Sequence, residues 1–137
     1  MDLIRRDTDY AFRFADQLAG VYDDGCPLSA RVLAKDNGVS YTLGCKILQK
    51  LAAAGLVESI MGPKGGFRLS KNPEKIEFKQ IIEAIQGPVS VNKCLIGDFK
   101  CPLKGKCPAQ PKMAKLQMHI NGYLKELTLK EFVSGDK

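Results

Sequence analysis

The apolar residues at the start of the chain recur every three or four positions, which is the spacing of one helix face. Between Thr8 and about Tyr22 this pattern predicts a helix with one buried stripe. The stripe consists of Ala11, Phe12, Ala15, Leu18, Ala19 and Tyr22. The Asp-Asp-Gly sequence at 23–25 favours a turn, so we expect the helix to end there.

Two further helices are expected in PLSARVLAKDNGVSYTLGCKILQKLAAAGLV at 27–57. Ser29 and Ser40 each stand where an N-cap is needed, Asn37-Gly38 suits a turn with positive φ, and Gly55 fits the C′ position of the second helix. In that helix the expected inward stripe is Leu43, Ile47, Leu48, Leu51 and Ala54, and the expected outward residues are Tyr41, Thr42, Lys46 and Lys50. Two helices joined in this way are typical of a helix-turn-helix.

A hairpin and a packed helix are expected after it. LVESI at 56–60 and FRLS at 67–70 have the character of short strands, and MGPKGG at 61–66 that of the turn between them. Phe78, Ile81, Ile82 and Ile85 then recur at helical spacing before the stop signal Gly87-Pro88. The predicted fold is therefore mainly α with a small β-hairpin wing, a winged helix-turn-helix domain over residues 1–87.

The rest of the chain has a different organisation. Residues 88–110 are expected to form a loop, because they are rich in proline and have little periodicity. From about Pro111 a long helix follows, and a short helix begins near residue 129 after a capping box at 128–131. We expect the long helix, within a dimerisation segment at 111–137, to pair through a heptad-like seam of Met113, Leu116, Ile120, Tyr123 and Leu127.

Basic residues gather where the helix-turn-helix and the hairpin are expected. The chain has a net charge of +6 and a pI near 9.1, and residues 40–71 contain five Lys or Arg against one Glu. Recognition helices contact base edges with polar and cationic side chains, and wings contact the DNA backbone. The predicted DNA-binding residues are Ser40, Tyr41, Thr42, Lys46, Lys64, Gly65, Gly66 and Arg68. For the two glycines, the needs of a tight hairpin turn are an equally good explanation.

Three of the five cysteines lie in the loop, with the spacing C-x6-C-x5-C. No apolar run has the roughly 18 residues of a membrane span, and the N-terminus lacks the core of a signal peptide, so we expect a cytoplasmic protein in which structural disulfides are disfavoured. Zinc knuckles use tighter pairs and a fourth Cys or His. Three explanations for the loop cysteines remain open: an iron–sulfur cluster with a ligand from elsewhere, a reversible disulfide switch, or incidental thiols. Cys26 and Cys45 are expected to be small buried or incidental residues.

The order of these features resembles the Rrf-two family of bacterial transcription regulators, which includes IscR-type and NsrR-type members. The matches are TDYAFR at 8–13, GLVESIMGPKGGFRLS at 55–70, IIEAIQGP at 81–88 and the three cysteines, and they extend over nearly the whole chain. The resemblance implies a homodimer whose two winged helices bind a pseudo-palindromic DNA operator. It also implies an iron–sulfur cluster held near the dimer interface by Cys94, Cys101 and Cys107, whose state tunes DNA affinity.

The family resemblance also suggests the fourth ligand. In the IscR type, which holds a 2Fe-2S cluster, this ligand is a histidine three residues after the last cysteine, where this chain has Gln110. The single histidine, His119, falls on the predicted long helix and is expected to be a surface or seam residue.

The NsrR type completes a 4Fe-4S cluster with the aspartate of a Thr-Asp pair in the first helix of the other subunit. Thr8-Asp9, with Arg13 one turn on, matches that pattern. Asp9 is therefore the predicted ligand, with Asp7 as a poorer substitute, and a 4Fe-4S cluster is favoured over 2Fe-2S. A first-turn acid favoured by the helix dipole is the alternative explanation for Asp9.

One departure from the family concerns the wing. In the IscR type an arginine precedes the wing Gly-Pro, whereas Met61 precedes Gly62-Pro63 here. Lys64 or Arg68 is left to contact the minor groove in its place.

The predicted function is that of a homodimeric transcription regulator, a repressor, controlled by a cluster that senses nitric oxide, oxygen or redox state, or iron. An alternative is a cluster-free regulator controlled by thiols or by a partner protein, as in the cysteine-metabolism branch of the family; a distant one is an iron–sulfur electron carrier. An enzyme is not expected, because the chain has one histidine and no nucleophile elbow or phosphate loop.

Overall fold

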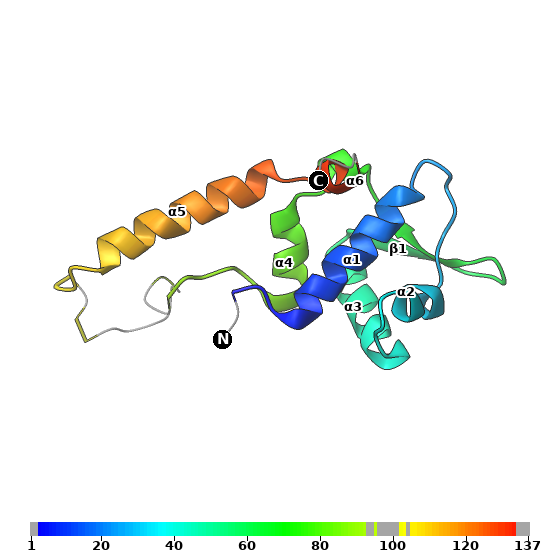
Figure 1. The fold of residues 1–137 in the computed structure, drawn as a ribbon, viewed down its shortest axis with the longest axis horizontal. Helices are drawn as coiled ribbons and strands as arrows, with labels where there is room; N and C mark the ends of the chain where they lie inside the picture. The colour runs from blue at the N-terminus through cyan, green and yellow to red at the C-terminus, as the bar shows by residue number, and fades with distance from the viewer. Residues whose placement is uncertain (1–2, 93–94, 96–101, 104, 134–137) are drawn as a thin grey trace.

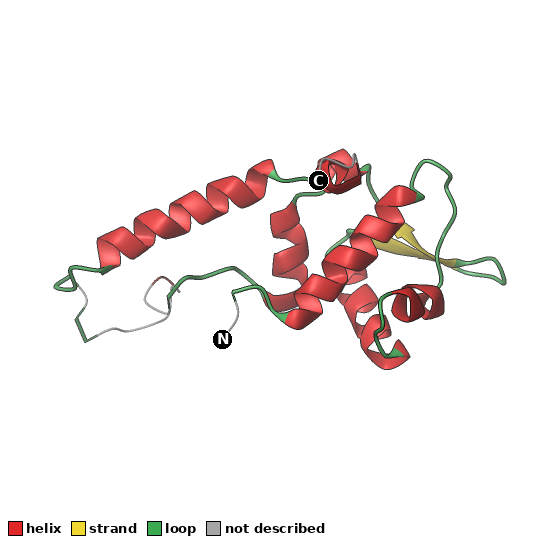
Figure 2. Ribbon diagram, viewed as in Figure 1, coloured by secondary structure: helices red, strands yellow, loops and turns green. Residues whose placement is uncertain are grey.

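A computed structural model describes residues 3–92, 95, 102–103 and 105–133. The predictions for Cys94 and Cys101 lie outside these residues. The elements, in chain order, are α1 (Arg6–Gly20), α2 (Ala30–Asp36), α3 (Tyr41–Ala53), β1 (Val57–Ile60), β2 (Gly66–Leu69), the 3-10 helix η1 (Pro73–Lys75), α4 (Phe78–Gln86), α5 (Gln110–Glu126) and α6 (Leu129–Val133). The structure confirms a mainly helical fold with a two-stranded antiparallel hairpin (Figures 1 and 2).

Local signals in the sequence define the helix-turn-helix formed by α2 and α3. The side chains of Ser29 and Ser40 cap these helices by accepting backbone N–H bonds, each 3.2 Å long, from Val32 and Leu43. Gly38 makes the turn between the helices with φ 66°. Both predicted caps and the predicted turn are therefore confirmed.

The core lies between α1, α3 and α4 and contains aliphatic residues from each. The fully buried side chains include Phe14, Leu18, Leu33, Ile47, Leu48, Leu51, Ile76, Ile81, Ile82 and Leu129. The predicted inward stripe of α3 is correct at Ile47, Leu48 and Leu51, but Ala54 is exposed. Ala54 is the C-cap of α3, so it has already left the helical repeat that turns the other residues inward.

The hairpin is tied to the segment that leads into α2. Strand β1 pairs with β2 in the register Val57↔Leu69, and Leu28 and Phe67 exchange backbone hydrogen bonds of 2.9 and 2.7 Å. A Cβ added to Gly66 would lie 2.5 Å from the Leu28 carbonyl oxygen, and one added to Gly65 would lie 2.0 Å from the Ile60 carbonyl oxygen. Both glycines are thus required by backbone packing, whatever else they contact.

After α4 the chain extends away from the domain, and α5 runs back toward it and leads into α6 (Figure 1). Leu129 of α6 is 1% exposed and belongs to the core, which the sequence pattern did not predict. Backbone bonds from Phe78 N–H to the Leu127 carbonyl (2.9 Å) and from Leu129 N–H to the Ile76 carbonyl (3.1 Å) hold this return. The end of the chain therefore closes the winged-helix domain.

No residue of α5 itself is buried. Leu116 and Tyr123 of the predicted seam are 51% and 62% exposed, while Met113, Ile120 and Leu127 are partly exposed. Within the described part of the chain, none of the helices has both the length and the apolar character needed to cross a membrane.

We expect Leu129→Ala to lower the free energy of unfolding by about 2–5 kcal/mol, because it leaves a cavity in the core and weakens the return of α6. Met118→Ala is the control. Met118 is 73% exposed, so its loss should change the free energy by less than about 0.5 kcal/mol. Urea unfolding followed by circular dichroism measures both, and equal effects would contradict the assignment of α6 to the core.

Candidate functional site

The outward face of α3 carries the predicted groove residues. Tyr41, Thr42, Lys46 and Lys50 are all exposed, as is the capping residue Ser40. The opposite face of α3 is anchored in the core through Ile47, Leu48 and Leu51. The helix therefore presents a polar and cationic surface from a rigid support.

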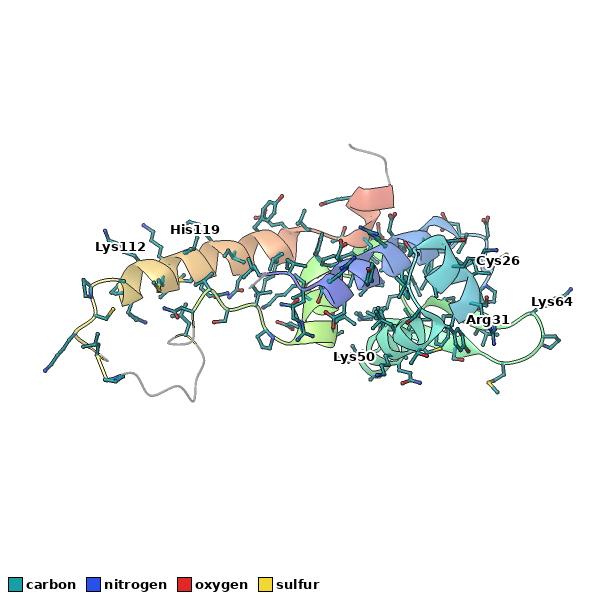
Figure 3. All side chains as sticks on the ribbon, turned by 60° about the horizontal axis from the view of Figure 1, so that its bottom comes forward. Cys26, Arg31, Lys50, Lys64, Lys112 and His119 are labelled. Carbon is teal, nitrogen blue, oxygen red and sulfur yellow. The ribbon has the colours of Figure 1, made fainter. Side chains whose placement is uncertain are left out.

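The hairpin carries a second exposed cation at its turn. Lys64 is exposed in the turn, and Figure 3 shows it on the same half of the molecule as Lys50. Arg68 is half-exposed and forms an ion pair with Glu58, its cross-strand neighbour. Met61 is 90% exposed. Lys64 is thus the more available cation of the two that the sequence analysis named for the wing.

Tyr41, the first residue of α3, is held by residues from both helices of the motif. The guanidinium carbon of Arg31 lies 4.5 Å from the centre of the Tyr41 ring. A hydrogen bond with Cys45 raises the pKa of the Tyr41 phenol, and the nearby Arg31 charge opposes this shift. Arg31 could not be predicted from the sequence, because its contact with Tyr41 joins two helices and leaves no periodic signal.

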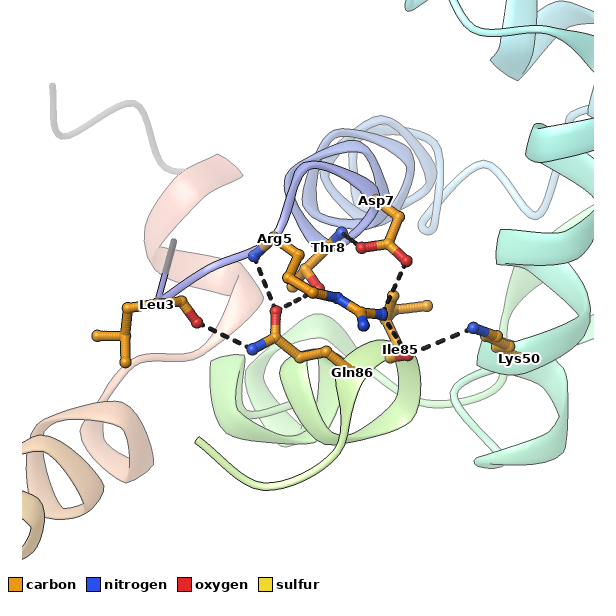
Figure 4. Close-up of polar contacts among 7 residues, drawn as sticks. All are labelled: Leu3, Arg5, Asp7, Thr8, Lys50, Ile85 and Gln86. Carbon is orange, nitrogen blue, oxygen red and sulfur yellow. Dashed lines mark hydrogen bonds and ion pairs between the residues drawn. The ribbon is translucent and has the colours of Figure 1, made fainter. Parts of the chain in front are cut away.

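The end of α4 connects α1 with the rest of the domain through one amide side chain (Figure 4). The Gln86 Oε1 atom accepts hydrogen bonds from the Arg5 backbone N–H (2.9 Å) and from the Thr8 hydroxyl (2.7 Å), and its Nε2 atom donates to the Leu3 carbonyl (2.9 Å). Thr8 is fully buried. Gln86 therefore fixes the first turn of α1 against α4.

The neighbouring carbonyl of Ile85 connects this junction to the recognition helix. It accepts hydrogen bonds from the Arg5 guanidinium and from the Lys50 ammonium, both 3.4 Å long. Figure 4 shows Lys50 reaching it from α3, while Arg5 reaches it from the N-cap of α1. A single backbone oxygen thus contacts side chains from both helices.

The two carboxylates at the start of α1 have different surroundings. Asp9 forms an ion pair with Arg13 at 3.0 Å, and its side chain is 51% exposed. Asp7 pairs with Arg5 at 3.0 Å, accepts the Thr8 N–H and is 27% exposed. Asp9 is therefore the more accessible carboxylate to a group outside the chain.

The start of the cysteine loop is fastened to α5 by one side chain. The Gln117 Oε1 atom accepts the Val91 N–H and its Nε2 atom donates to the Val89 carbonyl, each at 2.8 Å. The Asn92 amide lies 3.0 Å from the Met113 sulfur. The segment that leads toward Cys94 in the sequence therefore runs along the first turns of α5.

The other end of the cysteine loop leads directly into α5. Cys107 is partly exposed, has a free thiol and precedes the first residue of α5 by three positions. Residues 89–92 and Cys107 therefore both lie close to α5, one through hydrogen bonds and the other along the chain. In the regions that the structure describes there is no group of three or more His, Cys, Asp or Glu side chains that could hold a metal.

The remaining predicted residues lie elsewhere. Cys26 is exposed rather than buried, beside the end of α1, and Cys45 is partly buried on α3. His119 is exposed on α5 (Figure 3). Cys26 and Cys45 lie outside the segments around Cys107 and Gln117, whereas His119 follows Gln117 by two positions on α5.

Comparison with known proteins identifies the family. The model of the Rrf2 (Rrf-two) family, described as an iron-dependent transcriptional regulator, matches residues 4–135. The chain belongs to this family. Its relatives are transcriptional regulators rather than enzymes, as the sequence predicted.

Two relatives and one solved structure illustrate the similarity. The transcriptional repressor NsrR of Streptomyces coelicolor is 32% identical over 128 residues, which cover 93% of this chain and 86% of NsrR. The regulator IscR of Klebsiella pneumoniae is 27% identical over 81% of this chain and 68% of IscR. CymR (YrzC), the global cysteine regulator of B. subtilis, superposes over all of both chains with a TM-score of 0.80 and 25% identity.

We expect Gln86→Ala to lower the free energy of unfolding by about 1–3 kcal/mol, because the buried Thr8 hydroxyl loses its acceptor. Gln49→Ala, at an exposed position on α3, is the control and should have an effect within about 0.5 kcal/mol. Urea unfolding monitored by circular dichroism compares the two. A Gln86→Ala protein as stable as the control would mean that the junction contributes nothing to stability.

Proposed function

We propose that this Rrf2-family chain is a homodimeric DNA-binding repressor whose operator affinity is controlled by an iron–sulfur cluster. Cys94, Cys101 and Cys107 of one subunit and Asp9 of the partner subunit would hold the cluster. The observation that carries the proposal is the attachment of both ends of the cysteine loop to α5, the helix proposed to join the subunits.

The DNA-binding face comprises Ser40, Tyr41, Thr42 and Lys46 of the recognition helix and Lys64 of the wing. Their exposure on an element anchored from behind supports contact with a DNA groove. Gly65, Gly66 and Arg68 would lie along the DNA backbone, where Gly65 and Gly66 keep the hairpin narrow enough to approach it.

Pairing of α5 with its copy in a second subunit is supported by the exposure of its apolar residues. A helix of 17 residues with none buried has little stability from its own chain, because helices in proteins depend mainly on packing of an apolar face. A dimer along Met113, Leu116, Ile120, Tyr123 and Leu127 would supply that packing.

The donor set fits an iron–sulfur cluster in its chemistry. Three thiols within one loop, of which Cys107 is free and partly exposed, are soft ligands suited to iron in such clusters. When bound, the cluster would supply an iron centre whose state responds to nitric oxide, oxygen or iron supply. A carboxylate is a harder ligand than a thiolate, so Asp9 would provide the bond that a signal displaces first.

The route from cluster to DNA would run through α1. Asp9 lies one residue after Thr8, which is hydrogen-bonded to Gln86, and the adjacent Ile85 carbonyl contacts Lys50 of α3. Release of Asp9 by the partner would alter the position of α1 and, through this junction, the angle of the recognition helix.

A second candidate is a cluster-free regulator controlled by thiols or by a partner protein. The full-length similarity to CymR, a cysteine regulator, favours it. The two candidates differ in a direct observable, because only the first binds iron and inorganic sulfide.

Asp9→Ala should weaken cluster retention while the dimer stays intact, because one of the four ligands is lost. Asp16→Ala is the matched control, since Asp16 is an exposed carboxylate on the same helix and is assigned no ligand role. Anaerobic purification followed by native mass spectrometry gives the subunit number and the cluster mass of each variant.

Three results can be distinguished. A dimer with one 4Fe-4S cluster per subunit, labile in Asp9→Ala and stable in Asp16→Ala, agrees with the proposal. A 2Fe-2S mass that is indifferent to both substitutions would contradict Asp9 as the ligand. A colourless dimer, even after reconstitution with iron and sulfide, would favour the thiol-controlled regulator.

A further inference from the structure

Arg31 differs from the other arginines of the chain in its partners. Each of the other four donates to a side chain: Arg5 to Asp7, Arg6 to Tyr10, Arg13 to Asp9 and Arg68 to Glu58. Across the described residues, the guanidinium of Arg31 has an aromatic ring beside it but no hydrogen-bond acceptor. Its five N–H donors therefore remain available to a group outside the chain.

The stacking partner limits the positions that Arg31 can adopt. Arg31 belongs to the first turn of α2, and Tyr41 is the first residue of α3, so the contact joins the two helices of the helix-turn-helix. Arginine stacks on aromatic rings through its planar face while its edge stays free to form bidentate hydrogen bonds. The guanidinium is thus oriented before any ligand arrives.

Tyr41 also interacts with Cys45, one helical turn further along α3. The hydrogen bond between them favours the protonated phenol and raises its pKa. A neutral phenol does not repel an anion bound by Arg31. The three residues form an ordered array, Arg31–Tyr41–Cys45, at the surface of the motif.

The location of the array indicates that the anion is a phosphate of the DNA backbone. In a helix-turn-helix, the N-terminal part of the second helix enters the major groove and the first helix crosses the DNA backbone. Arg31 extends from the first of these helices over the N-terminus of the second. In Figure 3 it lies between Lys50 and Lys64, the cations of the recognition helix and the wing.

We propose that Arg31, held over Tyr41, anchors a DNA phosphate at the edge of the groove that α3 enters. This inference rests on the proposed DNA-binding function and adds a residue that was not among its predicted contacts. A phosphate contact fixes the position of the protein on the duplex and carries no sequence information of its own.

Removal of the guanidinium should weaken binding to all duplexes alike. For Arg31→Ala we expect about a tenfold loss of affinity at moderate salt. The slope of log K against log salt should fall in magnitude by about 0.9 for each Arg31 in the bound protein. The probes are a duplex selected by the wild-type protein from a random-sequence library and an unrelated duplex of equal length, measured by fluorescence anisotropy.

Three further variants separate charge from geometry. Arg31→Lys should keep the wild-type salt slope but lose roughly two- to fivefold in affinity, because an ammonium lacks the planar stack and the bidentate edge. Tyr41→Leu should lower affinity by a larger factor in the wild-type background than in Arg31→Ala, since the ring acts partly through Arg31. Lys75→Ala is the charge control. It removes one positive charge from η1, which packs against α6 and lies away from α3 in Figure 1. The salt slope should therefore be unchanged.

Two results would overturn the proposal. An Arg31→Ala protein with the salt slope and affinity of Lys75→Ala would exclude a phosphate contact. A loss confined to one base pair of the selected duplex would make Arg31 a base-reading residue instead. Arg31 is exposed, so thermal unfolding should be unchanged in each variant and checks that the fold is intact. A wild-type protein that enriches no duplex from the random-sequence library would contradict the DNA-binding function itself.

Discussion

The hydrogen bonds at the C-terminal end of α4 connect the start of α1, the recognition helix α3 and the beginning of the cysteine loop. Gln86 satisfies the buried hydroxyl of Thr8 and the backbone of Arg5, and the Ile85 carbonyl receives side chains from both α1 and α3. A buried hydroxyl without a partner would cost on the order of 1–3 kcal/mol, so α1 is held in one position. Because the helix ends at Gly87, the loop that follows begins directly beside this junction.

The path of the chain after the junction leaves α5 without a buried residue. The chain leaves the domain at Gly87, and α6 brings it back when Leu129 enters the core. Between these points α5 buries no residue against its own domain. Gln117 uses that helix to hold the backbone at Val89 and Val91. This arrangement agrees with the proposal that α5 binds a second subunit and that the thiols of the loop hold a cluster.

Much of the fold follows from local signals in the sequence. Ser29, Ser40, Gly38 and Gly55 have side-chain or backbone preferences that act within one turn, and each is found as the pattern predicted. Ala54 was misplaced because the inward stripe was extended to the C-cap, one position beyond the last residue of α3. The burial of Leu129 was missed because it depends on a return of the chain across the whole domain.

The site could be predicted to a smaller extent, since its contacts join distant segments. The exposure of Tyr41 and Lys46 follows from the period of α3, whereas the stack of Arg31 on Tyr41 depends on the angle between two helices. The contact between Lys50 and Ile85 joins residues 35 positions apart. The assignment of Asp9 and the three cysteines to a cluster rests on family resemblance and on donor chemistry, and it remains a proposal.

The central claim is that the state of the cysteine loop controls DNA binding through α1 and the Ile85–Gln86 junction. The most direct measurement is the anaerobic affinity of the wild-type dimer for a duplex that it selects from a random library, before and after removal of iron and sulfide. The account predicts that the two affinities differ by at least about tenfold, which corresponds to a coupling free energy of about 1.4 kcal/mol. Equal affinities of the cluster-bound and cluster-free dimers would contradict it.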